Sequence, residues 1–570
     1  MSSLRRSVAG VLAVASALGA TGPASAQAIS QALDSAYTAK IRELTLTHPL
    51  WKFTTELVDH LPASATVPSP LRTLGYVPGT IGKLSYVADV NRYFKAVADA
   101  SPRVELFSLG MSDEGREMIV AAVADEATIG KLADYRAMIA RLADPRGLSA
   151  DERARLLREA KPIYWLTGTI HSPETGSPEM LMELLYRLAV EESDYIKAIR
   201  GGVITLITPV TEVDGRDRMV DVYNQSKRLG VPNRNLVYWG KYTAHDNNRD
   251  AIGMSQKLTQ HMLRGWLGWR PTVAHDLHES VPFLYTSTGT GPYNEQFDPI
   301  QVGEWHQLAY QEINELTRCG LPGIWTHGFY DGWAPNYMLA IANFHNGIGK
   351  FYETYTSSGA DCTNVNLGAA QVSRVWYRPN PAVNGVRWCI RSNINFQQSG
   401  VLIALKYVAD NRGTFLENFV AKGERMVRRG QTTSPYAFVI PRTQRHAAEA
   451  ADLVNLIRMQ GTEVQVASGE WATRSGPKVV ENMLPAPGAP AAGSAAPAAR
   501  DSAADAPVRR EPSDANAAQP PDSARRDTTA RRDTAAARGD SAARSVAAAP
   551  APAAPGGRGA GGGRGGGGRG

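Results

Sequence analysis

Short apolar runs alternate with longer amphipathic stretches through the middle of the chain. Apolar runs of this length, bounded by polar or turn-forming residues, predict buried strands. They lie at residues 163–168, 203–208, 271–276 and 348–353. After the first run, a helical pattern opens at Pro178 and places Met182, Leu185 and Leu188 on one face. Strands that alternate with helices predict an α/β domain with a mostly parallel mixed sheet flanked by helices.

The same patterns extend to both sides of this region. Residues 76–160 predict a helix followed by a strand, a turn and a second strand. Near the C-terminus, apolar runs at 436–441 and 463–468 enclose an amphipathic stretch at 444–461, which Gly461 closes. We therefore expect a small C-terminal α/β extension containing a βαβ unit.

The two ends of the chain have compositions that do not suit a folded domain. At the N-terminus, Arg5 and Arg6 precede a short apolar stretch and a small-residue cleavage pattern, which predicts a signal peptide and an exported protein. The C-terminus is rich in Ala, Pro, Arg and Gly and has almost no large apolar residues, so it predicts a disordered tail. The expected map is 1–26 signal peptide, 27–75 leader region, 76–370 catalytic domain, 371–483 extension and 484–570 tail.

The charge and the cysteine content argue against a nucleic-acid-binding protein and against a fold built on disulfides. The net charge is +6, and the tail holds 12 Arg against 8 Asp and Glu, so the remaining chain is nearly neutral and does not suggest nucleic-acid binding. The tail's Arg-Gly repeats are of a type that can bind RNA, but an exported protein makes this use unfavourable. Three cysteines allow at most one internal disulfide. No later apolar run is long enough to span a membrane, and the oligomeric state is open.

Candidate chemistry lies at the ends of two predicted strands. His171 and Glu174 follow the run at 163–168, while His275 and His278 follow or end the run at 271–276. Ligand sites in open α/β sheets lie at the carboxyl ends of strands. Two imidazoles and one carboxylate suit a catalytic zinc site, although polar residues at strand ends explain the pattern too. A second His-x-x-Glu pair, His446 and Glu449, lies on the amphipathic C-terminal stretch and predicts only a solvated helix face.

The order of several motifs resembles the zinc carboxypeptidase family, the carboxypeptidase A-like metallopeptidases, in a bacterial exported form. The motifs are His171-Ser-Pro-Glu174, Asp214-Gly215, Asn248-Arg249, the "AHDLHES" segment at 274–280 and Glu353. The resemblance covers roughly residues 80–360 and implies a carboxypeptidase-like fold that binds one Zn²⁺ ion. Implied metal ligands are His171, Glu174 and His278, with His275 as the alternative to His278.

The resemblance also implies the remaining roles. Glu353 is the expected general base, with Glu279 as runner-up. Arg249 and Asn248 are expected to bind the terminal carboxylate of a peptide, although Arg249 also suits a salt bridge with Asp246 or Asp250. Asp276 is a candidate for orienting an imidazole.

Two features depart from the family pattern. The carbonyl-polarising arginine has no secure counterpart, and Lys241 or Arg234 lies in its interval. The family's mobile tyrosine matches Tyr337 or Tyr330, and we favour Tyr337. The implied function is a zinc metallocarboxypeptidase that acts on peptide or protein C-termini in the periplasm or outside the cell. The alternatives are a zinc amidase or deacylase acting on cell-wall peptides or N-acyl amino acids, and a non-catalytic zinc- or peptide-binding module.

Overall fold

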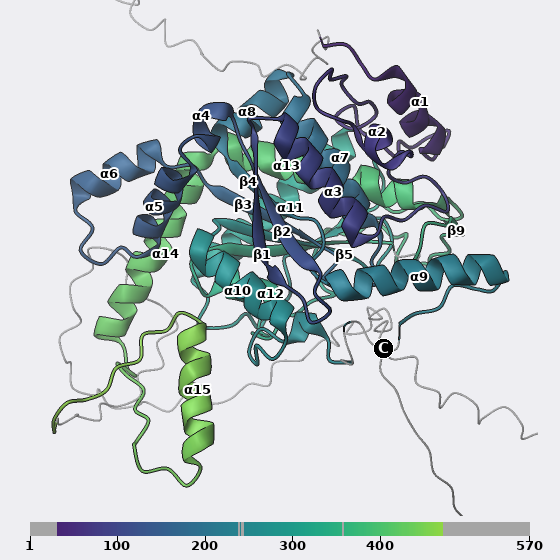
Figure 1. Cartoon of the computed structure of the whole chain (residues 1–570). Helices are drawn as coiled ribbons and strands as arrows, with labels where there is room; N and C mark the ends of the chain where they lie inside the picture. Colours follow the sequence, from purple (N-terminus) through teal and green to yellow (C-terminus); the bar gives the residue numbers. More distant parts are fainter. Residues whose placement is uncertain (1–30, 237–239, 241–243, 356–357, 471–570) are drawn as a thin grey trace, which may run out of the picture. The chain divides into compact units, whose positions relative to one another are not determined.

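The computed structural model describes residues 31–236, 240, 244–355 and 358–470 (Figure 1). Contacts divide the chain into two units, Met1–Pro520 and Pro521–Gly570, and every described residue belongs to the first. The predicted signal peptide at 1–26 and tail at 484–570 lie outside the described residues, so both stay predictions.

A mixed sheet of eight strands forms the centre of the first unit, in the order β1-β2-β4-β3-β5-β8-β6-β7. The four central strands β4, β3, β5 and β8 run parallel, and antiparallel strands flank them on both sides. This confirms the predicted fold class. The strands are β1 Val104–Met111, β2 Glu117–Val123, β3 Ile163–Gly168, β4 Ile204–Thr208, β5 Val273–Glu279, β6 Leu284–Thr286, β7 Ile324–Trp325 and β8 Ile348–Thr354, with a separate pair β9 Thr363–Asn364 and β10 Arg387–Trp388.

Helices cover both faces of the sheet. Figure 1 shows the strands between α10 and α12 on one side and α7 and α13 on the other. The helices before β4 are α1 Ser35–Leu44, α2 Pro70–Leu74, α3 Val87–Ala100, α4 Glu126–Ile129, α5 Leu132–Ala143, α6 Ala150–Glu159, α7 Gly176–Val190 and α8 Asp194–Gly202. Those after it are α9 Val213–Leu229, the 3₁₀ turn η1 Asn247–Arg249, α10 Lys257–Trp269, α11 Pro299–Arg318, α12 Met338–Asn343, α13 Ile390–Asp410, α14 Arg412–Thr432 and α15 Ala447–Met459.

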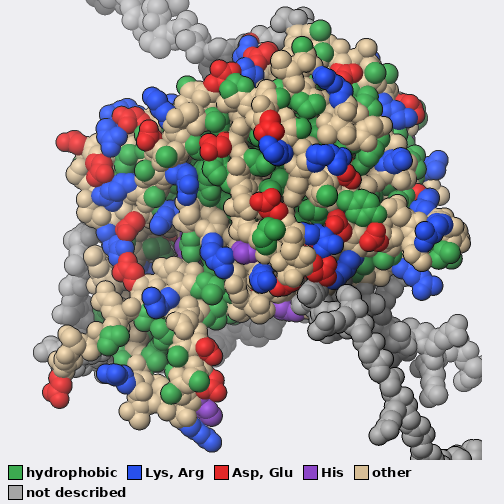
Figure 2. All heavy atoms as spheres, in the orientation of Figure 1, with side chains coloured by type: hydrophobic (Ala, Val, Ile, Leu, Met, Phe, Trp, Pro, Cys, Tyr) green, Lys and Arg blue, Asp and Glu red, His purple; other side chains and the backbone are tan. Residues whose placement is uncertain are grey.

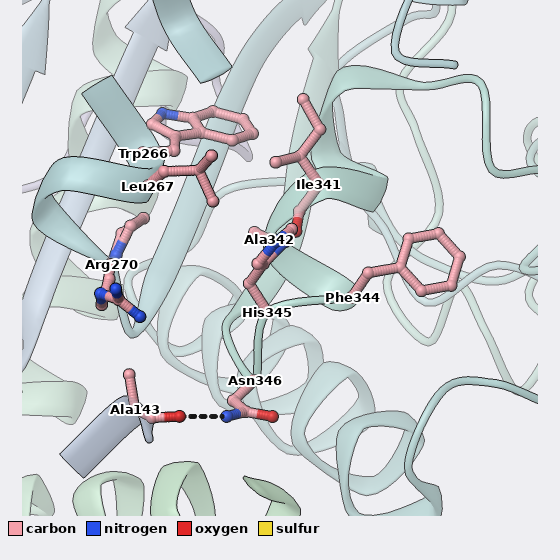
Figure 3. Close-up of a pocket in the computed structure, with 10 residues that line it drawn as sticks. Ala143, Trp266, Leu267, Arg270, Ile341, Ala342, Phe344, His345 and Asn346 are labelled. Carbon is pink, nitrogen blue, oxygen red and sulfur yellow. Dashed lines mark hydrogen bonds between the residues drawn. The ribbon is translucent and has the colours of Figure 1, made fainter. Parts of the chain in front are cut away.

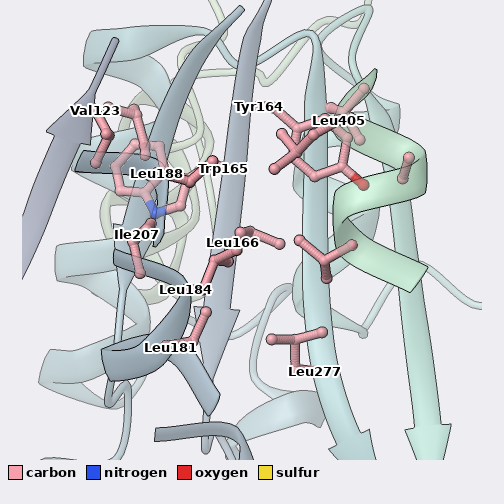
Figure 4. Packing of buried hydrophobic residues seen from close by; sticks show 14 of the residues in the cluster. Val123, Tyr164, Trp165, Leu166, Leu181, Leu184, Leu188, Ile207, Leu277 and Leu405 are labelled. Carbon is pink, nitrogen blue, oxygen red and sulfur yellow. The ribbon is translucent and has the colours of Figure 1, made fainter. Parts of the chain in front are cut away.

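The core lies between the sheet and the layer of α7 and α13. Figure 4 shows Leu166 and Leu277 of neighbouring strands packed with Leu184 of α7 and Leu405 of α13, and all four are fully buried. A buried Leu side chain contributes about 1.5–3 kcal/mol relative to an exposed one. This packing holds the central strands in place, and their carboxyl ends carry the candidate chemistry. The core continues past residue 370, the predicted start of the extension, because α13 belongs to it.

Helix α7 differs from the amphipathic helix that its sequence predicts, since all of its residues are buried. Its polar side chains are paired inside the protein. Glu179 accepts a hydrogen bond from Arg216 of α9, and Glu183 forms a buried ion pair with Arg391 of α13. Removing one partner of such a pair leaves an uncompensated buried charge, which costs about 3–5 kcal/mol.

The strand predicted at 271–276 is Val273–Glu279 in the structure. The apolar run ends early, but the polar residues after it stay in the strand because β3 and β8 pair with it on both sides. Alternation along a strand places Asp276 and His278 on the face covered by α12, together with Glu353 of β8. His275 and Glu279 lie on the opposite face.

The predicted C-terminal βαβ unit is wrong in its strands. Helix α15 forms where expected, but residues 436–441 and 463–468 are not strands. A strand needs a hydrogen-bonded neighbour, and neither segment pairs with another part of the described chain. Their apolar side chains stay in solvent, as the 89 % exposure of Phe438 and the 81 % exposure of Val466 show.

The structure also shows the distribution of surface charge and the state of the three cysteines. On the face displayed in Figure 2, Lys and Arg side chains are interspersed with Asp and Glu. Cys362 and Cys389 form a disulfide, and Cys319 is free. Among the described residues, no helix is both long and apolar enough to cross a membrane.

Candidate metal centre

The turn that carries His171 is held by the segment that follows β4. Backbone N–H groups of Thr211 and Glu212 donate to the carbonyl oxygens of Gly168 and Thr169. Thr169 is buried and has a φ of 48°, a conformation that is costly for a β-branched residue. Its hydroxyl donates to the Glu174 carbonyl at 2.9 Å, which closes the loop around His171. Strain of this kind persists only where the surroundings impose it.

Three predicted ligands converge at the carboxyl ends of β3 and β5. His171 Nδ1 lies 2.9 Å from Glu174 Oε1, and His278 Nδ1 lies 3.1 Å from Glu174 Oε2. The two Nδ1 atoms are 3.3 Å apart. One ligand atom from each residue lies within 4.8 Å of the other two, so the group could hold a metal ion.

An aspartate engages the far nitrogen of each ring. His171 Nε2 lies 3.1 Å from Asp246 Oδ1, and His278 Nε2 lies 2.7 Å from Asp276 Oδ2. Asp276 also accepts a hydrogen bond from Thr167 of β3 at 2.7 Å. The prediction that Asp276 orients an imidazole therefore has a counterpart in the structure. Sequence reasoning considered Asp246 only as a partner of Arg249 and missed its contact with His171.

These contacts fit a cation. A carboxylate oxygen only accepts, and carboxylates face both nitrogens of each ring, so both nitrogens carry hydrogen when no cation is present. A cation would take the place of the hydrogen on each Nδ1, while each Nε2–H group would stay bonded to its aspartate. The Nδ1 lone pairs of His171 and His278 would then point to the place that Glu174 also faces. Histidine metal ligands commonly have this arrangement, with the second nitrogen bonded to a carboxylate. The donor set of two imidazoles and one carboxylate suits Zn²⁺.

Without a cation, the carboxylates favour protonated imidazoles. Burial opposes protonation of His171, but Glu174 and Asp246 outweigh burial and raise its pKa to about 9. Burial opposes protonation of His278 as well, and Asp276 and Glu174 raise its pKa well above the ordinary value. Burial opposes ionisation of Glu174, yet the two imidazoles hold its pKa at about 2. The site therefore has a strong preference for positive charge.

The alternative residues on β5 lie on the other face of the sheet. The ring of His275 bonds the Tyr164 hydroxyl at 2.7 Å and packs on Tyr352. Glu279 accepts a hydrogen bond from Gly176 N at 2.9 Å, at the start of α7. Strand alternation thus brings His278, and not His275, to the group of ligands.

Glu353 lies beside the ligands, directly across from His278 in the register of β5 and β8. Its Oε2 accepts a hydrogen bond from Ser280 at 2.7 Å. Burial raises the pKa of Glu353 to about 7, with Glu174 adding to the shift and His278 opposing it. A carboxylate with a pKa near neutrality suits proton transfer.

The predicted substrate-binding residues form a connected group at the edge of the site. Asn248 lies in η1, where its Nδ2 is 3.4 Å from His278 Nε2 and its Oδ1 accepts from Met338 N at 2.9 Å. The Arg249 guanidinium lies 4.3 Å from the centre of the Tyr337 ring and 3.6 Å from Asp246 Oδ2. Tyr330 is more deeply buried, and its ring packs on those of Tyr337 and Phe351. Tyr337 therefore lies nearer to the candidate arginine than Tyr330 does.

The described residues do not identify the group that would polarise the scissile carbonyl. Lys241 lies outside the described residues, and Arg234 is exposed. Asp214 and Gly215 begin α9, where Asp214 accepts from the Ser112 hydroxyl at 2.7 Å and pairs with Arg116. The Asp-Gly motif therefore stabilises the turn after β4 and contributes no group to the site.

The family comparison covers the first half of the site. Residues 90–262 match the model of the family described as zinc carboxypeptidase. The matched region includes His171, Glu174, Asn248 and Arg249. His278 and Glu353 lie beyond the matched residues. A search of curated proteins finds no match.

Solved structures with a similar arrangement include bacterial carboxypeptidases. The chain is 14 % identical to a metallo-carboxypeptidase from Burkholderia cenocepacia, with 56 % of this chain and 68 % of that chain covered and a TM-score of 0.36. It is 16 % identical to a putative carboxypeptidase A from Shewanella denitrificans, with 57 % of this chain and 69 % of that chain covered and a TM-score of 0.37. A third structure is a metallo-carboxypeptidase from Pseudomonas aeruginosa in complex with (2-guanidinoethylmercapto)succinic acid. The identity to it is 12 %, with 56 % of this chain and 68 % of that chain covered and a TM-score of 0.38. Likeness at this level carries no information on substrate.

Proposed function

We propose that the protein is a zinc metallocarboxypeptidase that removes C-terminal residues from peptides or proteins. The observation that carries this proposal is the convergence of His171 Nδ1, Glu174 and His278 Nδ1 beside Glu353, in a chain whose residues 90–262 match the zinc carboxypeptidase family. His171, Glu174 and His278 would hold one Zn²⁺ ion. The ion would supply a Lewis acid for the scissile carbonyl and lower the pKa of water.

Glu353 is the proposed proton carrier. Ser280 occupies its Oε2 with one hydrogen bond, which fixes the carboxylate on the face of His278. In its ionised form Glu353 accepts a proton from the attacking water and then donates it to the leaving amine. Glu279 cannot take this role, because its side chain is bonded to the start of α7 on the opposite face.

Arg249 is the proposed group that binds the substrate's terminal carboxylate, with Asn248 beside it. A guanidinium presents two parallel N–H donors to a carboxylate. The ring of Tyr337 supports the guanidinium, and the contact with Asp246 is longer than a close ion pair at 3.6 Å. Asp246 therefore bonds His171 more closely than it bonds Arg249. The guanidinium also donates to the Asn248 carbonyl at 2.9 Å, and its remaining N–H groups are the donors proposed for a substrate carboxylate.

Two separate features support a proposal for the compartment. The predicted signal peptide implies export, and the Cys362–Cys389 disulfide is a bond that persists in oxidising compartments. We propose on these grounds that the protein acts in the periplasm or outside the cell.

The test compares a peptide with a free C-terminus, the same peptide amidated, and an N-acyl amino acid. Zinc content is measured by mass spectrometry on the same protein preparation. We expect one zinc per chain, release of the C-terminal residue from the free peptide only, and a KM for it that rises in Arg249→Gln. Lys257→Gln, an exposed residue paired with Asp113, is the matched control for loss of a positive charge.

Other outcomes select the alternatives. Equal cleavage of the free and the amidated peptide would exclude recognition of the terminal carboxylate. Turnover of the N-acyl amino acid alone would identify a deacylase. Bound zinc without turnover of any substrate would identify a binding module.

A further inference from the structure

A cavity of about 190 Å³ lies away from the metal centre, where α5, α10 and α12 end. Its walls come from the ends of these helices and from the turns that precede β5 and β8. Figure 3 shows the lining side chains. They are Ala143, Trp266, Leu267, Arg270, Pro271, Ile341, Ala342, Phe344, His345 and Asn346.

Arg270 is the unusual member of this lining. It ends α10 in the left-handed conformation, with φ 51° and ψ 62°, at a position where glycine is the common residue. Its guanidinium makes no hydrogen bond or ion pair with any described residue. In Figure 3 the side chain extends from the end of α10 toward the side on which Ala143 and Asn346 lie. A strained backbone that presents an unpaired cation to a cavity is an observation that points to a ligand.

Among the other polar side chains of the lining, the nitrogens of His345 and Asn346 are already engaged, whereas the buried Nε1 of Trp266 has no hydrogen-bond partner among the described residues. The two ring nitrogens of His345 face the carbonyl oxygens of Ile341 and Gln460, at 2.6 and 3.0 Å. Asn346 donates from its Nδ2 to the Ala143 carbonyl at 3.2 Å. No Asp or Glu lines the cavity. Arg270 is therefore the single charged group available to a ligand, and the opposing charge has to come from that ligand.

The remaining lining sets the size and polarity of the ligand. Trp266, Ile341 and Ala342 are buried, and their side chains are apolar apart from the unbonded Nε1–H group of Trp266. A cavity of about 150 Å³ accommodates one benzene molecule, so the space here suits one ring or branched aliphatic group with a small charged group attached. A ligand with two negative charges would lack a second cation, and an ammonium group would lack a carboxylate.

We propose that this cavity binds a small monocarboxylate with one aromatic or branched aliphatic group. The carboxylate pairs with Arg270, and the apolar group packs on Trp266 and Ile341. The cavity is separate from the metal centre: Arg270 precedes β5 and His278 lies near the other end of that strand, roughly 20 Å away at 3.3 Å per residue. The inference therefore does not depend on the proposed peptidase activity.

The test measures binding of phenylacetate to the full chain by titration calorimetry. Phenylacetamide has the same shape without the charge, and phenylglycine adds an ammonium group. We expect phenylacetate to bind about tenfold or more tightly than either compound, since it alone forms the charge-assisted pair without an unpaired ammonium. Arg270→Gln should remove this difference. Arg264→Gln, an exposed arginine on the same helix whose side chain bonds His261, should leave it unchanged.

Two further variants make the result decisive. Ala143→Leu keeps Arg270 and fills the cavity, so phenylacetate should no longer bind. Arg249→Gln should leave phenylacetate binding unchanged. Failure of phenylacetate to bind the wild-type chain, or binding that survives both Arg270→Gln and Ala143→Leu, overturns the proposal. Binding that depends on Arg249 instead would assign the carboxylate to the metal centre and would also overturn it.

Discussion

The same His-x-x-Glu spacing occurs at His171–Glu174 and at His446–Glu449, in opposite surroundings. In the first pair the side chains are 15 % and 9 % exposed, and Nδ1 lies 2.9 Å from the carboxylate. In the second they are 66 % and 70 % exposed and 3.9 Å apart. The prediction that the second pair is a solvated helix face is confirmed. Spacing alone therefore does not identify a metal site.

The difference lies in what each pair follows along the chain. His171 and Glu174 come after a buried parallel strand, whose neighbour β5 brings His278 and Asp276 to the same edge of the sheet. His446 and Glu449 lie at the start of α15, which has no buried residue. An exposed pair of this kind contributes about 0–1 kcal/mol and is screened by salt. The parallel sheet supplies the third candidate ligand, His278, and one orienting carboxylate, Asp276, while Asp246 comes from the segment that caps η1.

The largest expected effect comes from breaking the buried pair. His171→Ala removes one of the three proposed ligands, so we expect loss of bound zinc and a fall in the proposed peptidase activity of about 10⁴-fold, because the metal would contribute several kcal/mol to the transition state. His446→Ala should retain both zinc and activity. Metal analysis and steady-state kinetics on the two variants check this. Zinc retained at wild-type affinity in His171→Ala would contradict the ligand assignment.

The next comparison is between two glutamates on opposite faces of the sheet. Glu353→Gln should lower kcat about 10²–10⁴-fold, the usual contribution of a general acid–base group, while zinc stays bound. Glu279→Gln should retain most activity, since its carboxyl accepts a hydrogen bond from Gly176 and faces away from the ligands. Single-turnover rates at saturating zinc separate the two. Equal losses in both variants would place the proton transfer elsewhere.

The sequence predicted the four central strands, because apolar runs are local properties, and the family resemblance named His171, Glu174 and His278, which the structure brings together. The sequence did not predict that β5 would extend to Glu279, since that depends on pairing with β8. The burial of all of α7 was also hidden, because its Glu183 is neutralised by Arg391, far away in sequence. Asp246 was considered only as a possible salt-bridge partner of Arg249, which it contacts at 3.6 Å, but the fold also brings it to His171. The paired strands expected around α15 fail for the same reason, since pairing is not a local property.

A third prediction concerns the aspartates that make the buried pair different from the exposed one. Asp246→Asn and Asp276→Asn each replace an acceptor that orients an imidazole. We expect zinc affinity to fall about 10–100-fold in each variant, with the fold retained. Competition with a chelator measures the affinity. Asp361→Asn, which removes an exposed partner of Lys227, should leave zinc affinity unchanged.

The pH dependence gives a smaller and graded effect. Glu353 has a pKa raised to about 7 by burial, and only its ionised form accepts a proton. A bound cation favours the ionised form, so kcat/KM at saturating zinc should fall about tenfold per pH unit below an apparent pKa of no more than about 7. The acid limb should disappear in Glu353→Gln. An acid limb that persists unchanged in this variant would assign it to another group.

The smallest effect is expected for the exposed pair, His446 and Glu449. Replacing this pair tests whether the His-x-x-Glu spacing alone contributes to metal binding or to stability. If the spacing had intrinsic value, replacing both His446 and Glu449 by Ala would weaken metal binding or the fold. Surface substitutions of this kind change the free energy of unfolding by no more than about 0.5 kcal/mol. In a chain of this size that corresponds to a shift in Tm of about 0.5 °C, which calorimetry can measure. A larger shift would mean that α15 has a partner for this face, and a second zinc in the wild-type chain that the double variant lacks would show that spacing alone suffices.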